Sequence, residues 1–175
     1  MAANNPCVVR PLAAADTVAF RDLRLNAITL NPECFCTALS EAKLQDVHYY
    51  QALIRQTDNS PHQLLFGAFS PEGKLLGVIG LERMSGTLRA HRARFWGLIT
   101  DTKYRRQGIA RQLCTHAINQ ARTMSVEKLS IELTGEAVPA LHLYRSLGFR
   151  IESVEPLALK LDDRYLDEIR MALCF

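Results

Sequence analysis

The sequence lacks any apolar run approaching the roughly 20 residues of a membrane-spanning helix. Its longest apolar stretches, Leu64–Phe69 and Leu75–Leu81, have the length of strands. The first eleven residues hold no basic segment followed by an apolar one, which is the pattern of a secretory signal. We therefore expect no membrane partner and a cytoplasmic location.

Cysteine is scarce and irregularly spaced. The odd number of five thiols, without a repeated spacing, is typical of reduced cysteines rather than of a disulfide framework. No cluster of histidine and cysteine completes a zinc spacing around Cys34-Phe35-Cys36. We expect no metal site.

A large charge of one sign is also missing. The 21 Lys+Arg and 18 Asp+Glu leave a net charge of +3, and aromatic residues make up 7%. A nucleic-acid-binding surface would need a wider basic area with interleaved stacking aromatics, and only Tyr104 interleaves with the basic residues at 103–111. We expect no nucleic-acid partner. The remaining composition, 48% hydrophobic and 22% charged, is that of a globular chain, and its length favours a single domain over residues 1–175.

Hydrophobic periodicity and turn residues predict the order of the elements. We expect strands at Val8–Arg10, Gln63–Ser70, Lys74–Glu82, Arg92–Thr100 and Lys128–Thr134, one beginning at Phe149 and one at about Tyr165–Leu173. We expect helices from a cap at Asp16 to about Thr29, from a cap at Ser40 to about Gln56, from about Gly108 to Thr123, and at Pro139–Leu147. The fold class is then α/β (α+β), with a mixed, mostly antiparallel, twisted sheet of about seven strands and about four helices on its faces. The strands on either side of the third helix should run parallel, joined by a right-handed crossover.

A basic, glycine-containing loop, Leu98–Ala110, joins a strand to the third helix. Gly108 stands where the helix begins, so backbone N–H groups there can approach a ligand closely. The first N–H groups of a helix lack intrahelical acceptors and bind phosphates. Further positive charge comes from Lys103, Arg105, Arg106 and Arg111. The pattern predicts a pyrophosphate cradle, with a solvated basic turn as the alternative; it is neither a P-loop nor a dinucleotide fingerprint.

A second segment, Ala140–Phe149, follows the next strand. Ala140 and Tyr144 are four residues apart and share one face of a helix. The small neighbour leaves room for a ligand beside Tyr144, and the alternative is a core tyrosine at a helix end.

Together the two segments resemble the GNAT superfamily of acetyl-CoA-dependent N-acetyltransferases. The family pattern R/Q-x-x-G-x-G/A is matched by Arg105–Ala110. Its downstream pattern A-x-x-x-Y-x-x-x-G-F is matched by Ala140, Tyr144, Gly148 and Phe149. The motifs lie within about Arg92–Phe149, and the element order extends the resemblance over nearly the whole chain.

The resemblance implies one N-acetyltransferase domain that uses acetyl-CoA as co-substrate. The pyrophosphate would lie on the loop residues Arg105, Arg106, Gln107, Gly108, Ile109, Ala110 and Arg111. The pantetheine arm would pair as an added strand with the backbone of Leu98, Ile99 and Thr100, and the thioester would lie near Ala140 and Tyr144. Ala137 departs from the family, which often has an asparagine there that contacts the pantetheine.

The same resemblance implies direct attack of an amine on the thioester, with both substrates bound. Tyr144 would donate to the departing thiolate, since a thiol has a pKa of about 8.5 and a phenol about 10. A backbone N–H near Leu98–Thr100 would stabilise the oxyanion. Glu82 is the candidate general base, with a solvated strand-end charge as its alternative; Glu132 and His91 are fallback choices.

The acceptor, an amine of a small molecule or peptide, would lie between the first two helices, their connection and the last two strands. These segments supply Arg24, Glu33, Phe35, Tyr165, Asp167 and Glu168. The charged run Thr87–Arg94 is either a solvated hairpin tip or a contact for an acidic substrate. A non-catalytic acyl-CoA-binding or sensing module on the same fold stays open. So does a homodimer, because family members often pair through sheet edges and C-terminal strands.

Overall fold

The computed structural model describes residues 7–175, so the first six residues, on which the expectation of no signal segment partly rests, lie outside it. Seven strands form one sheet in the order β1-β2-β3-β4-β5-β7-β6. The strands are β1 Val8–Pro11, β2 Gln63–Phe69, β3 Leu75–Arg83, β4 Arg92–Thr100, β5 Lys128–Thr134, β6 Arg150–Leu161 and β7 Arg164–Cys174. The α-helices are α1 Thr17–Leu30, α2 Leu39–Leu44, α3 Val47–Asn59, α4 Ile109–Thr123 and α5 Val138–Ser146. None of these helices has the length and apolarity that a membrane span requires.

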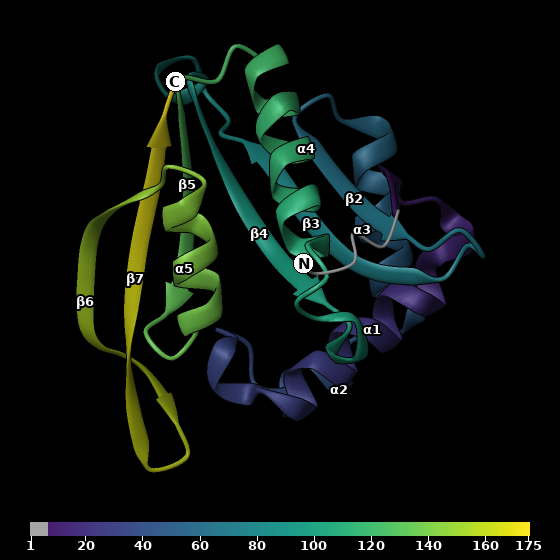
Figure 1. Ribbon diagram of the computed structural model, residues 1–175, viewed down its shortest axis with the longest axis horizontal. Helices are drawn as coiled ribbons and strands as arrows, with labels where there is room; N and C mark the ends of the chain where they lie inside the picture. The colour runs from purple at the N-terminus through teal and green to yellow at the C-terminus, as the bar shows by residue number, and fades with distance from the viewer. Residues whose placement is uncertain (1–6) are drawn as a thin grey trace.

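The sheet is mixed, as expected. Neighbouring strands pair antiparallel except β4 and β5, which run parallel and are joined through α4. Figure 1 shows α4 and α5 in front of the sheet and α1 and α3 behind it. The helical layers therefore cover both faces of the strands that carry the candidate loop.

Side chains on the two faces of the sheet form two cores. On one face, the α4 stripe of Ile109, Leu113 and Ala117 is buried against Ile79 and Leu81 of β3. On the other face, α1 and α3 are packed through a cluster that contains Phe20, Leu23, Ala27, Tyr50, Ile54 and Val78. Because both helical layers pack on the same strands, the ends of α1 and α4 are held in fixed positions beside β4.

The second expected helix is wrong in its extent. Instead of one helix from Ser40 to about Gln56, the chain forms α2 and α3, separated at Gln45-Asp46. Asp46 has an extended backbone, and its Oδ1 accepts a hydrogen bond of 3.0 Å from the N–H of Tyr49, which caps α3. Ser40 lies inside α2, whose N-cap is Ala38. Residues 7–175 thus contain five α-helices where about four were expected.

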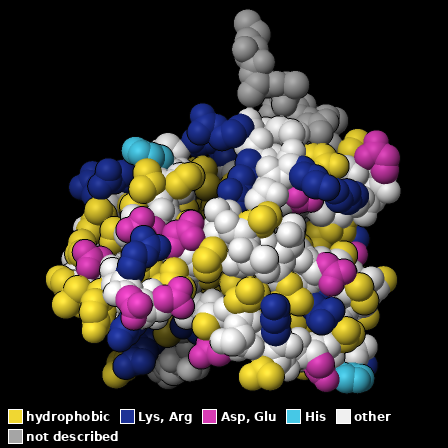
Figure 2. Space-filling view, turned by 90° about the horizontal axis from the view of Figure 1, so that it is seen from below, with side chains coloured by type: hydrophobic (Ala, Val, Ile, Leu, Met, Phe, Trp, Pro, Cys, Tyr) yellow, Lys and Arg dark blue, Asp and Glu magenta, His cyan; other side chains and the backbone are white. Residues whose placement is uncertain are grey.

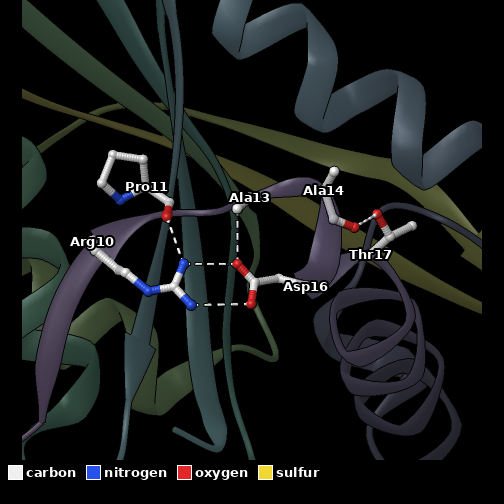
Figure 3. Close-up of polar contacts among 6 residues, drawn as sticks. All are labelled: Arg10, Pro11, Ala13, Ala14, Asp16 and Thr17. Carbon is white, nitrogen blue, oxygen red and sulfur yellow. Dashed lines mark hydrogen bonds and ion pairs between the residues drawn. The ribbon is translucent and has the colours of Figure 1, made fainter.

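Asp16 occupies the predicted N-cap position of α1 but does not cap it with its side chain. Its carboxylate instead accepts hydrogen bonds from Arg10 Nη1 at 2.7 Å, Arg10 Nη2 at 3.1 Å and the N–H of Ala13 at 2.8 Å (Figure 3). Burial alone would raise the pKa of Asp16. The hydrogen bonds from Arg10 and Ala13 together lower it by a larger amount, so the net shift is downward. The carboxylate therefore ties the end of β1 to the start of α1.

Replacing Asp16 with asparagine is expected to lower the free energy of unfolding by about 1–2 kcal/mol at pH 7, because charge-assisted hydrogen bonds are lost. Since the folded pKa is depressed, this contribution is complete above the unfolded carboxyl value of about 3.9 and is lost as the pH falls below it. Urea unfolding of both proteins at pH 7 and near pH 3 measures the effect. An equal difference at both pH values would contradict the ionic origin of this contribution.

Candidate functional site

Strands β4 and β5 diverge, and this leaves one backbone edge of β4 without a strand partner. Within the described chain, the two strands pair only at Arg92↔Lys128, Ala93↔Leu129 and Arg94↔Ser130. Beyond this point β5 continues along β7, and β4 continues along β3 to Thr100 (Figure 1). The edge of β4 over residues 95–100 therefore offers backbone groups to an extended, amide-containing ligand.

A β-bulge lies in the middle of this edge. Between the pairs Gly80↔Trp96 and Val78↔Ile99, β4 has one residue more than β3. Gly97 adopts a left-handed φ of +61° there. Bulges bend a strand and re-aim its groups, and they are common beside active sites. The sequence patterns above did not single out Gly97, although a glycine inside a strand pattern is the usual signal of a bulge.

The basic loop ends at a left-handed glycine that begins α4. Gly108 is the N-cap, with φ +81° and ψ 0°, and Arg106 also has a positive φ of 64°. The carbonyl of Gly108 accepts a hydrogen bond of 3.0 Å from the N–H of Gln112. The N–H groups of Ile109, Ala110 and Arg111 precede this bond, so they have no acceptor within the helix. The turn can therefore present several backbone donors to one anion.

Two arginines, one in the loop and one in the first turn of α4, are held by neutral partners. Arg105 Nη2 donates to Asn31 Oδ1 at 2.7 Å, which connects the loop to the end of α1. Arg111 Nη2 donates to Ser146 Oγ at 2.7 Å, which connects α4 to α5. Because neither partner is a carboxylate, both positive charges remain available to an anion at the turn.

Tyr144 on α5 is buried where β4 and β5 separate. It is 2% exposed, and its ring lies 6.5 Å from that of Phe95, the first β4 residue beyond the last pair with β5. Burial, and then contact with the Cys114 thiol, raise the pKa of Tyr144 well above its ordinary value. Burial likewise raises the pKa of Cys114 to about 12. Both groups therefore keep their protons at neutral pH, and the phenol can serve only as a hydrogen-bond donor or a weak acid.

The three candidate bases differ in how they are held. Glu82 Oε2 accepts from Nε and Nη2 of Arg94 at 2.7 Å and 2.6 Å. Glu132 is bound in the same way by Arg170, whose Nε lies 3.0 Å from Oε1. His91 is exposed in the turn before β4. The Glu82 oxygen that would accept the amine proton is already engaged by Arg94, so the role of Glu82 as base stays a prediction and requires this ion pair to open.

The connection between α1 and α2 lies over the end of β5 and over the β7 residue that pairs with it, Glu168. Thr134 Oγ1, fully buried, donates to the carbonyl of Glu33 at 2.6 Å. Cys36 Sγ lies 3.9 Å from Glu168 Oε2. Phe35 packs against the core shared by α1 and α3. The expected acceptor residues Glu33, Phe35 and Glu168 are thus brought to one side of the site.

The other expected acceptor residues lie in different places. Arg24 points from α1 toward the bulge, because an ideal Cβ on Gly97 would lie 3.9 Å from its Nη1. Asp167 accepts from the N–H of Leu157 at 3.0 Å within the β6–β7 hairpin. Tyr165 lies further along that hairpin, opposite Lys160, and is 57% exposed. Arg24 is therefore the acceptor candidate that reaches the free edge of β4.

The fold and this site define a member of an acyl-transferring class. The chain belongs to the acetyltransferase (GNAT) family, whose family model matches residues 27–149. This confirms the resemblance drawn from the two motifs.

Two curated relatives differ in how much of their length the chain covers. L-amino acid N-acetyltransferase AaaT of Escherichia coli K12 is 24% identical over 166 residues, which cover 94% of this chain and 96% of that protein. Human N-acetyltransferase 8 is 31% identical over 86 residues, which cover 49% of this chain and only 38% of that protein.

Solved structures share the fold. A GNAT-family acetyltransferase from Streptococcus pneumoniae has a TM-score of 0.86 at 18% identity, covering 97% of this chain and 100% of that one. The yncA protein of Salmonella typhimurium, solved with its cofactor acetyl-CoA, has a TM-score of 0.84 at 16% identity, covering 97% of this chain and 94% of that one. The predicted sheet with helices on both faces is confirmed by this likeness.

Proposed function

We propose that the protein is an N-acetyltransferase that moves an acetyl group from acetyl-CoA to an amine of a small molecule or peptide, with both substrates bound together. The observation that carries the proposal is the free edge of β4 beside the start of α4. A ligand with amide groups along one arm and a pyrophosphate at its end fits this combination. Membership of the family supports the same function, as does the acetyl-CoA with which the yncA protein was solved.

The residues present fit acetyl-CoA in most respects. The turn at Gly108 leaves backbone donors for the pyrophosphate, and Leu98, Ile99 and Thr100 lie on the free edge for the pantetheine arm. Ala137 is 5% exposed and has no polar side chain, so the contact that the family often makes through asparagine is missing. The backbone edge would then carry more of the binding of this arm.

Acetyl-CoA supplies an activated acyl group, and the chain positions it and stabilises charge. Backbone N–H groups near the bulge would stabilise negative charge on the carbonyl oxygen. Tyr144 would donate a hydrogen bond to the departing sulfur, because its raised pKa makes complete transfer of the proton unfavourable. The amine proton would leave through water, or to Glu82 if its pair with Arg94 opens.

A specific observation favours a second function, a non-catalytic acyl-CoA-binding module. Both candidate carboxylate bases are ion-paired, and Tyr144 is buried. Such a module would bind the ligand but release no free CoA thiol with any amine. Thiol release with a panel of amines therefore separates the two functions.

Acetyl-CoA is expected to raise the midpoint of thermal unfolding. At about 100 times its dissociation constant, a ligand adds about 2.7 kcal/mol, which is roughly 5–11 °C for a chain of this size. CoA serves as the parallel control for the part of the site that does not contact the acetyl group. No shift with either ligand at millimolar concentration would show that the glycine loop is only a structural turn.

A homodimer and a cytoplasmic location complete the proposal. Figure 2 shows hydrophobic side chains gathered on the left, over the β6–β7 hairpin, whereas Lys/Arg and Asp/Glu side chains are interspersed on this face. On the strands of that hairpin, Ile151, Val154, Leu157 and Tyr165 are 41–65% exposed. Exposed apolar side chains on C-terminal strands support pairing there.

A further inference from the structure

Two half-buried arginines of α1 and one buried tyrosine of α3, Arg21, Arg24 and Tyr50, form a polar cluster with unused hydrogen-bonding groups. Tyr50 is 0% exposed, and its hydroxyl has no hydrogen-bond partner among the described residues. The Nε atoms of Arg21 and Arg24 are also buried and have no hydrogen-bond partner among residues 7–175. A buried polar group without a partner is unfavourable, so these atoms favour an additional hydrogen-bonding partner.

The missing partner has to be an acceptor, and the balance of charge makes it an anion. Arg24 Nη2 makes a long hydrogen bond of 3.4 Å to a neutral group, Thr37 Oγ1. Arg21 lies 3.5 Å from a carboxylate oxygen of its neighbour Asp22, whose side chain is 63% exposed. Burial raises the pKa of Tyr50, and the neighbouring guanidinium groups of Arg24 and Arg21 lower it by less, so the hydroxyl keeps its proton and can donate. Guanidinium and phenol donors together suit a carboxylate, which accepts several hydrogen bonds.

The cluster lies beside the place where acetyl transfer would occur. Nη1 of Arg24 is 3.9 Å from the ideal Cβ position of Gly97, the residue that forms the bulge in the free edge of β4. Trp96, next to Gly97, and Phe35 pack against the same core as Tyr50. A substrate carboxylate bound to Arg24 would therefore hold an amine on the adjacent substrate carbon close to this edge.

We propose that the acceptor carries a carboxylate on the same carbon as its amine, as a free α-amino acid does, and that Arg24 and Tyr50 bind this carboxylate. Arg21 adds positive charge behind them. This inference rests on the proposed acetyl transfer and names the substrate class of that site. A neutral amide or an amine without an acid group would leave the guanidinium of Arg24 without an anion, so such acceptors are disfavoured.

The experiment uses the full chain with acetyl-CoA and measures release of the CoA thiol. The acceptors are L-amino acids, each tested beside its amide and its decarboxylated amine, so that the carboxylate is the principal difference. We expect kcat/KM to be about 100-fold higher for the free acids than for the amides. In Arg24→Gln the acid-to-amide ratio of kcat/KM is expected to fall at least tenfold. Most of this fall is expected in kcat/KM for the acids, since kcat/KM for the amides should change less than about threefold. Arg55→Gln on α3, an exposed arginine outside the cluster, is the matched control and is expected to keep the ratio.

Tyr50→Phe separates recognition from folding. Because the hydroxyl makes no hydrogen bond to the described residues, its removal is expected to leave the thermal midpoint unchanged or higher. The same variant is expected to raise KM for the acids about three- to tenfold. A lower midpoint with an unchanged KM would assign the hydroxyl to folding and overturn its role in binding. Arg24→Lys serves if the glutamine variant fails to fold, and it is also expected to reduce the acid-to-amide ratio, because lysine cannot form a bidentate pair.

The two proposals can fail separately. Equal rates with acids and amides in the natural protein, or an unchanged ratio in the Arg24 variants, would overturn the carboxylate site and leave acetyl transfer standing. No thiol release from any amine, together with no acetyl-CoA shift of the thermal midpoint, would overturn both.

Discussion

Valine in place of Gly108 is expected to raise the dissociation constant for acetyl-CoA by about 100-fold or more. The glycine has φ +81° at the start of α4, where a β-branched residue is strained by about 1–3 kcal/mol. Relief of that strain would rotate the first turn and misdirect the donors of Ile109 and Ala110. Hydrogen bonds to charged groups contribute about 1.5–3 kcal/mol each, so the loss of two exceeds a 100-fold effect. Isothermal titration with acetyl-CoA measures it.

A matched control for Gly108 exists in the turn between β2 and β3. Gly73 has φ +84°, and a Cβ there would meet no atom within 4 Å. Gly73→Val therefore introduces the same backbone strain away from the loop. We expect a similar loss of stability and an unchanged dissociation constant. Acetyl-CoA binding by Gly108→Val as tight as that of the natural protein would show that the turn does not hold the pyrophosphate.

Phenylalanine in place of Tyr144 is expected to reduce kcat about 100-fold without changing KM for acetyl-CoA. The change removes one hydrogen-bond donor to the sulfur and keeps the packing against Phe95 and Phe149. Because burial raises the pKa of Tyr144 well above 10, the hydroxyl stays protonated up to that pH. The natural protein should therefore show no fall in rate from ionisation of Tyr144 between pH 6 and about 10. Steady-state rates across this range measure both effects.

The contact between Tyr144 and Cys114 provides the control for that variant. Cys114→Ala removes the partner of the phenol and leaves the phenol in place. We expect it to lower stability by about 1 kcal/mol and to keep kcat within a few-fold. Equal losses of kcat in both variants would mean that the contact acts through packing rather than through donation to the sulfur. An unchanged kcat in Tyr144→Phe would remove the phenol from the reaction.

Local signals in the sequence were sufficient to predict the core of the fold. The stripe of Ile109, Leu113 and Ala117 determined the buried face of α4, because apolar residues at this spacing have one favourable place to pack. The bounds of β4 and β5 were predicted to the residue, since turn residues flank both. The motif around Gly108 and Tyr144 was enough to predict the family, which the family model confirms.

The rest depended on tertiary contacts that spacing does not show. Gln45 ends α2 and Asp46 caps α3, both with an extended backbone, and polar residues at such a point look like helix interior in sequence. The ion pair of Glu82 with Arg94 requires the register of β3 on β4. Tyr50 was missed altogether, since a tyrosine among apolar residues is normally part of the core and its unpaired hydroxyl is visible only once α1 is packed on α3.

Because β4 diverges from β5, the sheet consists of two halves that are joined by three residue pairs. One half contains β1 to β4, and the other contains β5, β7 and β6. A ligand arm lying between the two strands would make the hydrogen bonds that β5 does not make to β4, so the substrate itself would become part of the sheet. Binding would then also be a step of assembly, in which the two halves are fastened to one another for as long as the ligand stays.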